Sequence, residues 1–273
     1  MALMTGKRGL VIGIANERSY AYFIAQRLLA HGAEVGFSYL PQGKMENRVR
    51  KAVEGLGVED PFLEPLDAND DASLENFFEK VGEQWGGIDF LVHSIAFANR
   101  DYLKPDTFHT TPRDVYLSAI DTSAYTLLAM SRAAMPLMSA GEQGSHGGSI
   151  VCMSYYGGEK VTPGYNVMGV AKAALEQTAR YLAYELGDKD PDTGESRNIR
   201  VNTISAGPFK TLAGAGVGGM DEMIAHQERK SSLKRCNTGE EVGDTAAYLL
   251  SDLSSGVTGE TIHVDCGFSI VGV

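Results

Sequence analysis

The sequence has few cysteines, no clustered histidines and no long apolar run. Its three cysteines, Cys152, Cys236 and Cys266, stand far apart without a Cys-x-x-Cys pair, and its six histidines never approach metal-ligand spacing. We therefore expect no disulfide framework and no metal site, and a reducing compartment, the cytoplasm, fits best. No uncharged apolar run approaches about 18 residues and the N-terminus lacks a signal-peptide pattern, so we expect no membrane attachment.

Positive charge is also scarce. The 273 residues include 24 Lys and Arg against 35 Asp and Glu, which gives a formal net charge of -11. A nucleic-acid or anionic-membrane partner needs clustered cations to contact its phosphates, so neither partner is expected. The remaining composition, 43% hydrophobic and 22% charged, is typical of an ordinary soluble globular protein.

Short apolar runs alternate with helical patterns along the whole chain. The predicted strands are 9–14, 34–39, 62–66, 88–93, 149–154, 199–205 and 261–265, and the predicted helices are 20–31, 44–56, 72–84, 113–138, 167–186 and 240–250. Continuous rather than alternating apolar strands indicate a parallel sheet buried on both faces. We therefore predict an α/β fold: one domain over residues 1–273, with a doubly wound parallel sheet of about seven strands flanked by helices.

The first strand runs into a tight turn at Gly13, and a helix begins near Ser19. Backbone N–H groups at such a helix start can bind a pyrophosphate, although a glycine turn alone is also common in doubly wound proteins without a nucleotide. The second strand ends without an acid for a ribose and without a cation for a 2′-phosphate, and the nearest cation is Lys44. This favours NADH over NADPH.

Tyr165 and Lys172 stand seven residues apart. At about 100° per residue this spacing places both side chains on one helix face. A tyrosine beside a lysine can act as a neutral hydrogen-bond donor or acid, and the lysine charge favours phenolate character and can hold ribose hydroxyls. The ordinary alternative is a surface lysine below a packed tyrosine.

With these motifs together, the chain resembles the short-chain dehydrogenase/reductase superfamily, and within it the NADH-dependent enoyl-acyl-carrier-protein reductases of bacterial type II fatty-acid synthesis. The resemblance covers essentially the whole chain and rests on residues 13–20, 93–98, 154–155, 165–172, 204–208 and 259–268. Common carbonyl-reducing members have Tyr-x3-Lys, where this chain has Gly169, and an Asn-Ala-Gly turn, where it has Ser94-Ile95-Ala96.

The resemblance implies a Rossmann-type fold, a cytoplasmic homotetramer and hydride transfer from NADH to the trans-2 double bond of an enoyl thioester on acyl carrier protein. It implies that Tyr165 hydrogen-bonds the thioester carbonyl, that Lys172 holds the nicotinamide ribose and that Tyr155 lines the acyl site. Ala98 and Met168 would also contact substrate. The remaining cofactor contacts that it implies are Gly13, Ser19, Tyr20, Leu40, Asp67, Ala68, Ile95, Phe209, Lys210, Thr211, Leu212 and Ala213.

The glycine-rich apolar stretch 205–220 has no clear pattern and predicts a lid over the substrate, extending to about residue 230, with a poorly ordered connector as the alternative. After the stretch 205–220, four cations lie within seven residues: Arg229, Lys230, Lys234 and Arg235. Because carrier proteins are acidic, this group is either a docking patch or a solvated helix face.

The sequence departs from the family pattern at two places. Leu40 stands where a polar adenine-side residue is frequent, and 208–211 reads Pro-Phe-Lys-Thr where an Ile-Arg pair is common.

Two other functions stay open. One is a carbonyl or alcohol dehydrogenase on the same fold, against which Gly169 counts. The other is a nucleotide-sensing module without turnover, against which Tyr155, Tyr165 and Lys172 count.

Overall fold

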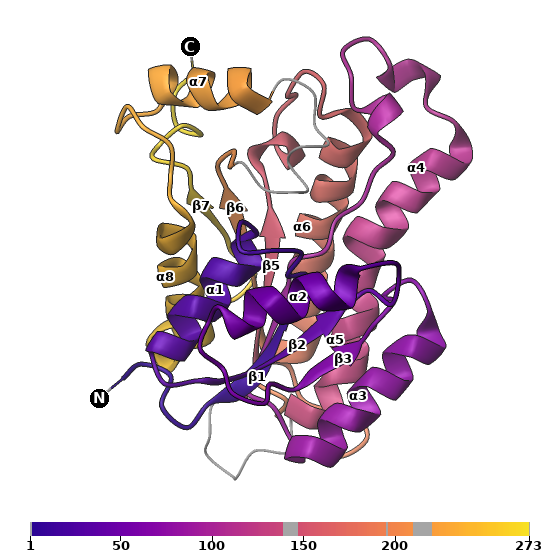
Figure 1. The fold of residues 1–273 in the computed structure, drawn as a ribbon, viewed down its shortest axis with the longest axis vertical. Coiled ribbons are helices and arrows are strands. Elements are labelled where there is room, and N and C mark those ends of the chain that lie inside the picture. The colour runs from indigo at the N-terminus through magenta and orange to yellow at the C-terminus, as the bar shows by residue number, and fades with distance from the viewer. Residues whose placement is uncertain (1, 139–146, 195, 210–219, 273) are drawn as a thin grey trace.

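The computed structural model describes residues 2–138, 147–194, 196–209 and 220–272, and within them seven strands form one sheet (Figure 1). The sheet order is β3-β2-β1-β4-β5-β6-β7, and every neighbouring pair is parallel. The strands are β1 (Arg8–Ile12), β2 (Glu34–Tyr39), β3 (Leu63–Pro65), β4 (Phe90–His93), β5 (Ser149–Ser154), β6 (Arg200–Ala206) and β7 (Thr261–Val264). This arrangement is the doubly wound, Rossmann-type sheet that the sequence predicts.

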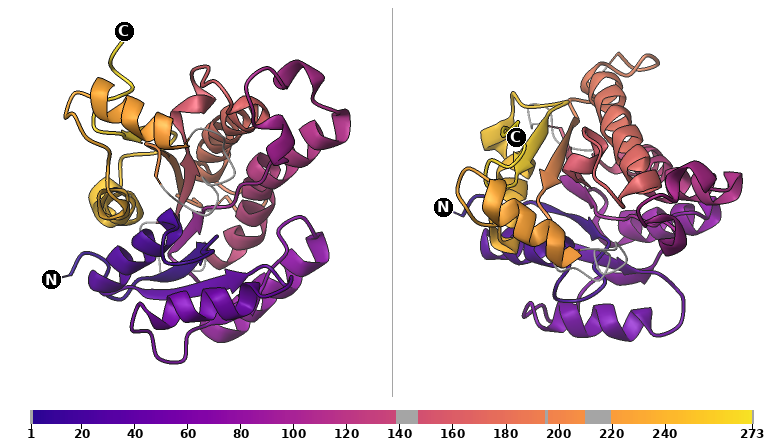
Figure 2. Two further views of the ribbon diagram at one scale, coloured as in Figure 1. Left: turned by 45° about the horizontal axis from the view of Figure 1, so that its top comes forward. Right: turned by 90° about the horizontal axis from the view of Figure 1, so that it is seen from above.

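Helices cover both faces of this sheet (Figure 2). They are α1 (Tyr20–Ala30), α2 (Met45–Glu54), α3 (Asp71–Trp85), α4 (Arg113–Ile120), α5 (Thr126–Met138), α6 (Asn166–Gly187), α7 (Met220–Lys230) and α8 (Gly239–Leu250). Short 3₁₀ turns lie at η1 (Arg100–Tyr102), η2 (Phe108–Thr110), η4 (Tyr156–Gly158) and η6 (Asp252–Ser254). None of the helices within the described ranges is long and apolar enough to cross a membrane.

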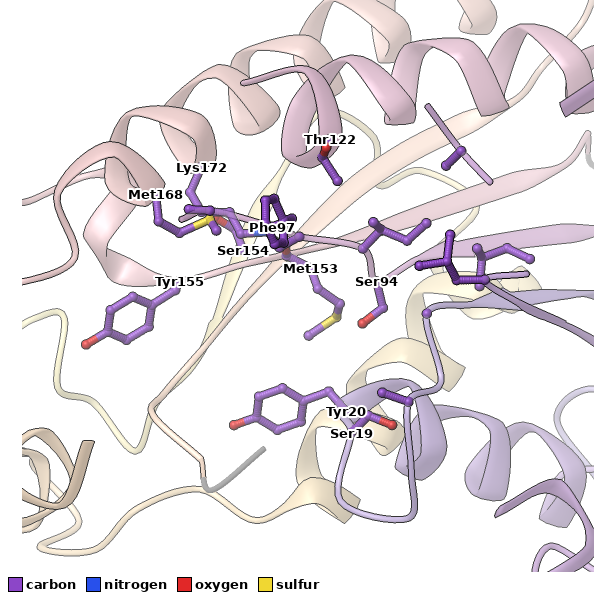
Figure 3. Close-up of a pocket in the computed structure, with 18 of the residues that line it drawn as sticks. Ser19, Tyr20, Ser94, Phe97, Thr122, Met153, Ser154, Tyr155, Met168 and Lys172 are labelled. Carbon is purple, nitrogen blue, oxygen red and sulfur yellow. The ribbon is translucent and has the colours of Figure 1, made fainter. Parts of the chain in front are cut away.

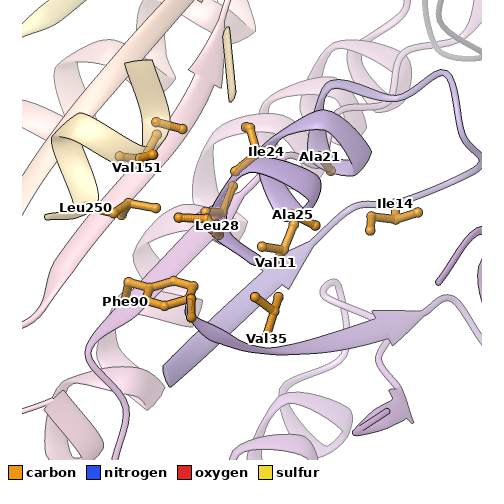
Figure 4. Packing of buried hydrophobic residues seen from close by; sticks show 14 of the residues in the cluster. Val11, Ile14, Ala21, Ile24, Ala25, Leu28, Val35, Phe90, Val151 and Leu250 are labelled. Atoms are coloured by element: carbon orange, nitrogen blue, oxygen red, sulfur yellow. The ribbon is translucent and has the colours of Figure 1, made fainter. Parts of the chain in front are cut away.

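Two cores explain the continuous apolar strands. On one face, α1, α2 and α8 pack on the sheet through side chains such as Ile24, Leu28 and Leu250, which meet Val11 and Phe90 (Figure 4). On the other face, α3, α5 and α6 bury a second cluster against β1, β4 and β5. Each large side chain that is fully buried stabilises the fold by about 1.5–3 kcal/mol. Strands between two such cores are buried on both faces, which explains their nearly continuous apolar runs.

The predicted helix 113–138 is interrupted in the structure. A π-helical stretch, η3 (Asp121–Tyr125), joins α4 to α5. One extra residue in a helical turn changes the apolar period too little to be seen in the sequence, so the prediction of one regular helix was wrong at this point.

Helix α7 was also not predicted. Its sequence is polar, and a mostly exposed helix lacks the apolar stripe that a sequence pattern detects. Of the predicted lid over 205–230, residues 205 and 206 end β6, residues 210–219 lie outside the described residues, and 220–230 form α7. Its role as a lid stays a prediction.

Candidate active site

A cleft of about 1090 Å³ lies where the carboxyl ends of the central strands meet. In an open parallel sheet a ligand binds at this edge, between the two strands where the chain reverses its direction of winding, here β1 and β4. The start of α1, with Ser19 and Tyr20, lies across the cleft from Lys172 and Met168 on α6 (Figure 3). Segments that are distant in the sequence thus form one elongated site.

The turn after β1 shapes one end of the cleft. Gly13 has φ of +111°, and a Cβ on it would overlap with the backbone carbonyl of Ser94 at the end of β4. Only glycine fits both conditions. Ser19 caps no N–H group of α1 with its side chain, its hydroxyl donates to the Asn16 carbonyl at 2.6 Å, and the first turn of α1 carries no acid. The positive end of the helix dipole therefore faces the cleft and can hold a phosphate.

Tyr20 lies at this end as predicted, but its hydroxyl is already engaged. It donates to the Gly207 carbonyl at 2.8 Å and accepts from the Asn237 side-chain amide at 2.9 Å. Its ring stacks on Phe209 with centroids 5.3 Å apart. Tyr20 thus braces the segment that follows β6, and Asn237, which supports it from 217 residues away, gave no signal in the sequence.

The adenine-side residues predicted from the resemblance do come together. Leu40, Asp67 and Ala68, at the ends of β2 and β3, all line the cleft. The side chains beside Leu40 that line it, Ser38, Gln42 and Met45, carry no positive charge that would attract a 2′-phosphate. Ile95 and Ala98 line the cleft after β4, and Phe209 lines it after β6. Lys210, Thr211, Leu212 and Ala213 lie outside the described residues.

Tyr165 stands at the N-cap of α6 and not within the helix. Its side chain is 8% exposed, and its ring meets that of Tyr155 edge-on with centroids 4.9 Å apart. Among the described residues, no hydrogen bond contributes to the pKa of the Tyr165 hydroxyl, and the residue lines the cleft. The hydroxyl is therefore available to a ligand.

Burial keeps this phenol protonated. It raises the pKa of Tyr165, and the neighbouring Tyr155 and Glu176 raise it further. The sequence predicted that Lys172 would favour phenolate character. Instead, removal of the ring from water penalises the charged form more strongly than any neighbour favours it. Burial also raises the pKa of Tyr155 to about 12, against a smaller opposite effect of a hydrogen bond with Thr162. Both tyrosines are neutral donors near neutral pH.

Lys172 reaches the same cleft from the second turn of α6. The residue is 6% exposed, and its Nζ donates to the Met153 carbonyl at 2.7 Å, at the end of β5. Burial lowers its pKa to about 8 because the ammonium ion loses its water, and Cys152 and Glu176 act in the opposite direction. One hydrogen bond uses one of three N–H donors, so the others can serve a ligand.

Asn166, which the sequence did not single out, ties the Tyr165 end of α6 to the loop before α4. Its amide donates to the carbonyls of Tyr102 and Lys104 at 2.9 and 2.7 Å and to Thr107 Oγ1 at 3.0 Å. It adopts φ of +41°, a conformation that asparagine tolerates better than most residues. Because the chain enters α6 through Asn166 in this conformation, Tyr165 stands directly before the helix. The hydrogen bonds of the Asn166 amide hold the loop that forms one wall of the cleft.

The described residues offer no group of three His, Cys, Asp or Glu that could hold a metal ion. Cys152 is fully buried, its Sγ lies 3.2 Å from Thr203 Oγ1, and burial raises its pKa to about 11. A thiol in this setting is a core side chain and no nucleophile.

The predicted cation group is partly neutralised. Arg235 forms two hydrogen bonds with the Glu241 carboxylate, at 3.0 and 2.6 Å, and Lys234 donates to the Arg229 carbonyl at 3.1 Å. Arg229 and Lys230 end α7. A docking patch at this place stays a prediction.

The chain is similar in sequence and fold to known proteins. A family model described as Enoyl-(Acyl carrier protein) reductase matches residues 13–269. The enoyl-acyl-carrier-protein reductase (NADH) FabI of Nostoc sp. is 48% identical, with 100% of both chains covered, and that of Synechocystis sp. is 47% identical, with 99% of both covered.

Two solved structures have the same fold. The Bacillus cereus enoyl-acyl carrier protein reductase with NADP⁺ and indole naphthyridinone has a TM-score of 0.91 at 43% identity, with 100% of both chains covered. The Aquifex aeolicus enoyl-acyl-carrier-protein reductase (NADH) has a TM-score of 0.89 at 42% identity, with 99% of both chains covered.

Gly169 provides a structural prediction. A Cβ at this position would lie 2.7 Å from the Gly157 carbonyl, so Gly169→Ala is expected to destabilise the protein by about 1–3 kcal/mol, measured by urea unfolding. Gly187→Ala at the other end of the same helix is the control, because nothing lies within 4 Å of the added Cβ. Equal stability of the two variants would contradict the close approach of α6 to Gly157.

Proposed function

The chain belongs to the family of enoyl-acyl-carrier-protein reductases, and from that premise we propose how its cleft carries out the reaction. The reaction is the reduction of the trans-2 double bond of an enoyl thioester on acyl carrier protein, the final reductive step of fatty-acid elongation, and the cofactor is NADH. The assignment of individual roles to residues is the proposal.

The cleft fits an extended dinucleotide. Gly13 and the uncapped start of α1 would hold the pyrophosphate, and Leu40, Asp67 and Ala68 would surround the adenine. Ile95 and Phe209 would border the nicotinamide half, and Lys172 would donate to the ribose hydroxyls. Bound NADH supplies the hydride, and the protein supplies orientation and electrostatics.

The Tyr165 hydroxyl is the group that we assign to the thioester carbonyl. When hydride reaches the β-carbon, negative charge moves onto the thioester oxygen, and a hydrogen-bond donor aimed at that oxygen lowers the barrier. The observation that carries this assignment is a buried, protonated phenol that lines the cleft and whose pKa no hydrogen bond from the described residues lowers. Tyr155, Ala98 and Met168 would form the apolar wall for the acyl chain.

A carbonyl reductase with Tyr-x3-Lys spacing does not fit this cleft, because the fourth residue after Tyr165 is Gly169, which lies against the Gly157 carbonyl. A long lysine side chain there would have to displace the backbone between β5 and α6. The lysine three residues further on, Lys172, reaches the cleft instead.

We also propose that the protein is a cytoplasmic homotetramer. Large apolar side chains are exposed on neighbouring helices, among them Tyr181 and Tyr184 on α6, which are 64% and 79% exposed, and Leu128 on α5. Exposed apolar groups of this kind are typical of contacts between subunits.

The first test of the roles is Tyr165→Phe. With crotonyl thioester as substrate, we expect oxidation of NADH to slow by about 10²-fold, while the dissociation constant of NADH changes by less than about two-fold. Absorbance of the reduced nicotinamide gives the rate, and its fluorescence gives the affinity. Tyr156→Phe, the neighbouring tyrosine that packs on Phe268, is the control and should keep its rate. Loss of NADH affinity in Tyr165→Phe would mean that the roles are misassigned.

The second test is Lys172→Met. Loss of the donors to the ribose should weaken NADH binding by about ten-fold or more, which corresponds to about 1.4 kcal/mol. Lys160→Met, the control, removes an exposed lysine between β5 and α6. This variant should bind NADH as the unaltered protein does. Unchanged NADH affinity in Lys172→Met would contradict the proposed contact between Lys172 and the ribose.

The oligomer is tested by light scattering of the purified protein. We expect a mass of about four chains, because the exposed tyrosines of α6 become buried between subunits. A Tyr181→Glu, Tyr184→Glu variant should dissociate to a smaller species. A stable monomer of the unaltered protein would contradict the proposal.

A further inference from the structure

Glu176 is a buried carboxylate that the roles given above do not use. It lies on α6, and its side chain is 3% exposed. The Ser154 hydroxyl donates to its Oε1 at 2.5 Å, and a Cβ on Gly158 would lie 2.8 Å from the same oxygen. Removal of a carboxylate from water costs several kcal/mol unless its charge interacts favourably with another group.

Two cations lie one turn of α6 away from Glu176: Lys172 before it, which is buried, and Arg180 after it, which is exposed. Residues four apart lie on the same side of a helix. The two side chains also hold consecutive residues of β5, because Lys172 Nζ donates to the Met153 carbonyl and Glu176 accepts from Ser154. No described carboxylate forms a direct ion pair with Lys172, so the attraction acts across the poorly hydrated interior, where charges are weakly screened.

We propose that Glu176 is a positioning residue whose buried negative charge keeps Lys172 in the ammonium form and so sets the alkaline limit of NADH binding. The proposal rests on the ribose contact of Lys172 proposed above. It assigns Glu176 no contact with the substrate or the cofactor.

The other titratable groups around Lys172 are uncharged near neutral pH. Burial raises the pKa of Cys152 on β5 to about 11 and lowers that of His93 on β4 to about 3. Burial also raises the pKa values of Tyr155 and Tyr165. Among the described residues that face Lys172, Glu176 is thus the group that can supply a negative charge.

Groups around Glu176 act in both directions. Burial raises its pKa most, and Glu159 adds to that effect. The Ser154 hydrogen bond lowers the pKa, as do Arg180 on α6 and His263 on β7. The hydroxyl of Ser154 therefore favours the ionised carboxylate that the proposal requires.

The direction of the pH effect follows from the lysine. Burial lowers the pKa of Lys172 to about 8, and the negative charge of Glu176 opposes this. As pH rises through that pKa, Lys172 loses its charge and holds the ribose hydroxyls less strongly. Removal of the Glu176 charge lowers the pKa further, so the loss of NADH affinity begins at a lower pH.

The test measures the NADH dissociation constant by nicotinamide fluorescence from about pH 6 to about pH 10 in Glu176→Gln. Glutamine keeps an acceptor for Ser154 but removes the charge. The midpoint of the alkaline loss of affinity is expected to fall by about one pH unit, so binding is about two- to three-fold weaker than normal near pH 7.5 and unchanged near pH 6. The unchanged affinity near pH 6 shows that the variant is folded.

Three variants separate charge from packing. Ser154→Ala removes the hydrogen bond but keeps the carboxylate, and Glu159→Gln removes a nearby charge that pairs with His263 at 2.6 Å. Glu159→Gln should keep the normal midpoint, and Ser154→Ala should lower it by less than Glu176→Gln does, because the carboxylate itself remains. Glu176→Asp keeps the negative charge, so its midpoint should lie close to that of the unaltered protein. If Glu176→Gln gives the normal profile, or if Ser154→Ala shifts the midpoint equally, the proposal is overturned.

Failure of the ribose contact itself would look different. If Lys172→Met binds NADH normally at every pH, the proposed role of Lys172 is wrong, and this inference falls with it. If Lys172→Met weakens binding while Glu176→Gln leaves the profile unchanged, only the inference is wrong.

Discussion

The attachment of helix α6 to the end of strand β5 determines where the reacting groups of the cleft lie. The Lys172 ammonium group donates to the Met153 carbonyl, Ser154 donates to Glu176, and the rings of Tyr155 and Tyr165 pack edge-on. These contacts involve three consecutive residues, the last two of β5 and Tyr155 directly after it. Because β5 is buried at every position, the helix start is held on a rigid support, and the phenol that is assigned to the substrate inherits that rigidity.

Burial gives the site its chemistry. The same exclusion of water keeps Tyr165 protonated, makes Lys172 easier to deprotonate and makes the charge of Glu176 effective over a distance. At the opposite end of the cleft, the start of α1, which no side chain caps, carries a positive potential. The cleft therefore combines an end with a positive helix potential, to which we assign the cofactor phosphates, and a poorly hydrated end, to which we assign the acyl thioester.

The sequence predicted the strands and the central site residues, because apolar runs and short motifs are local features. All seven strands lie where apolar runs occur, and Gly13, Tyr165 and Lys172 line one cleft. The engaged hydroxyl of Tyr20, the Asn166 bridge and the buried Glu176 depend on segments that meet only in the folded chain. No spacing along the chain reports such contacts. The π-helical stretch was missed because one inserted residue barely alters the apolar period.

The central claim is that one cleft presents the Tyr165 hydroxyl to the thioester and the Lys172 ammonium group to the cofactor ribose. A crystal structure of the protein with NADH and a non-reacting enoyl thioester analogue tests this most directly. The account predicts that Tyr165 Oη lies within about 3 Å of the thioester oxygen and Lys172 Nζ within about 3 Å of a ribose hydroxyl. A thioester oxygen held by another group, with Tyr165 turned toward protein, would contradict it.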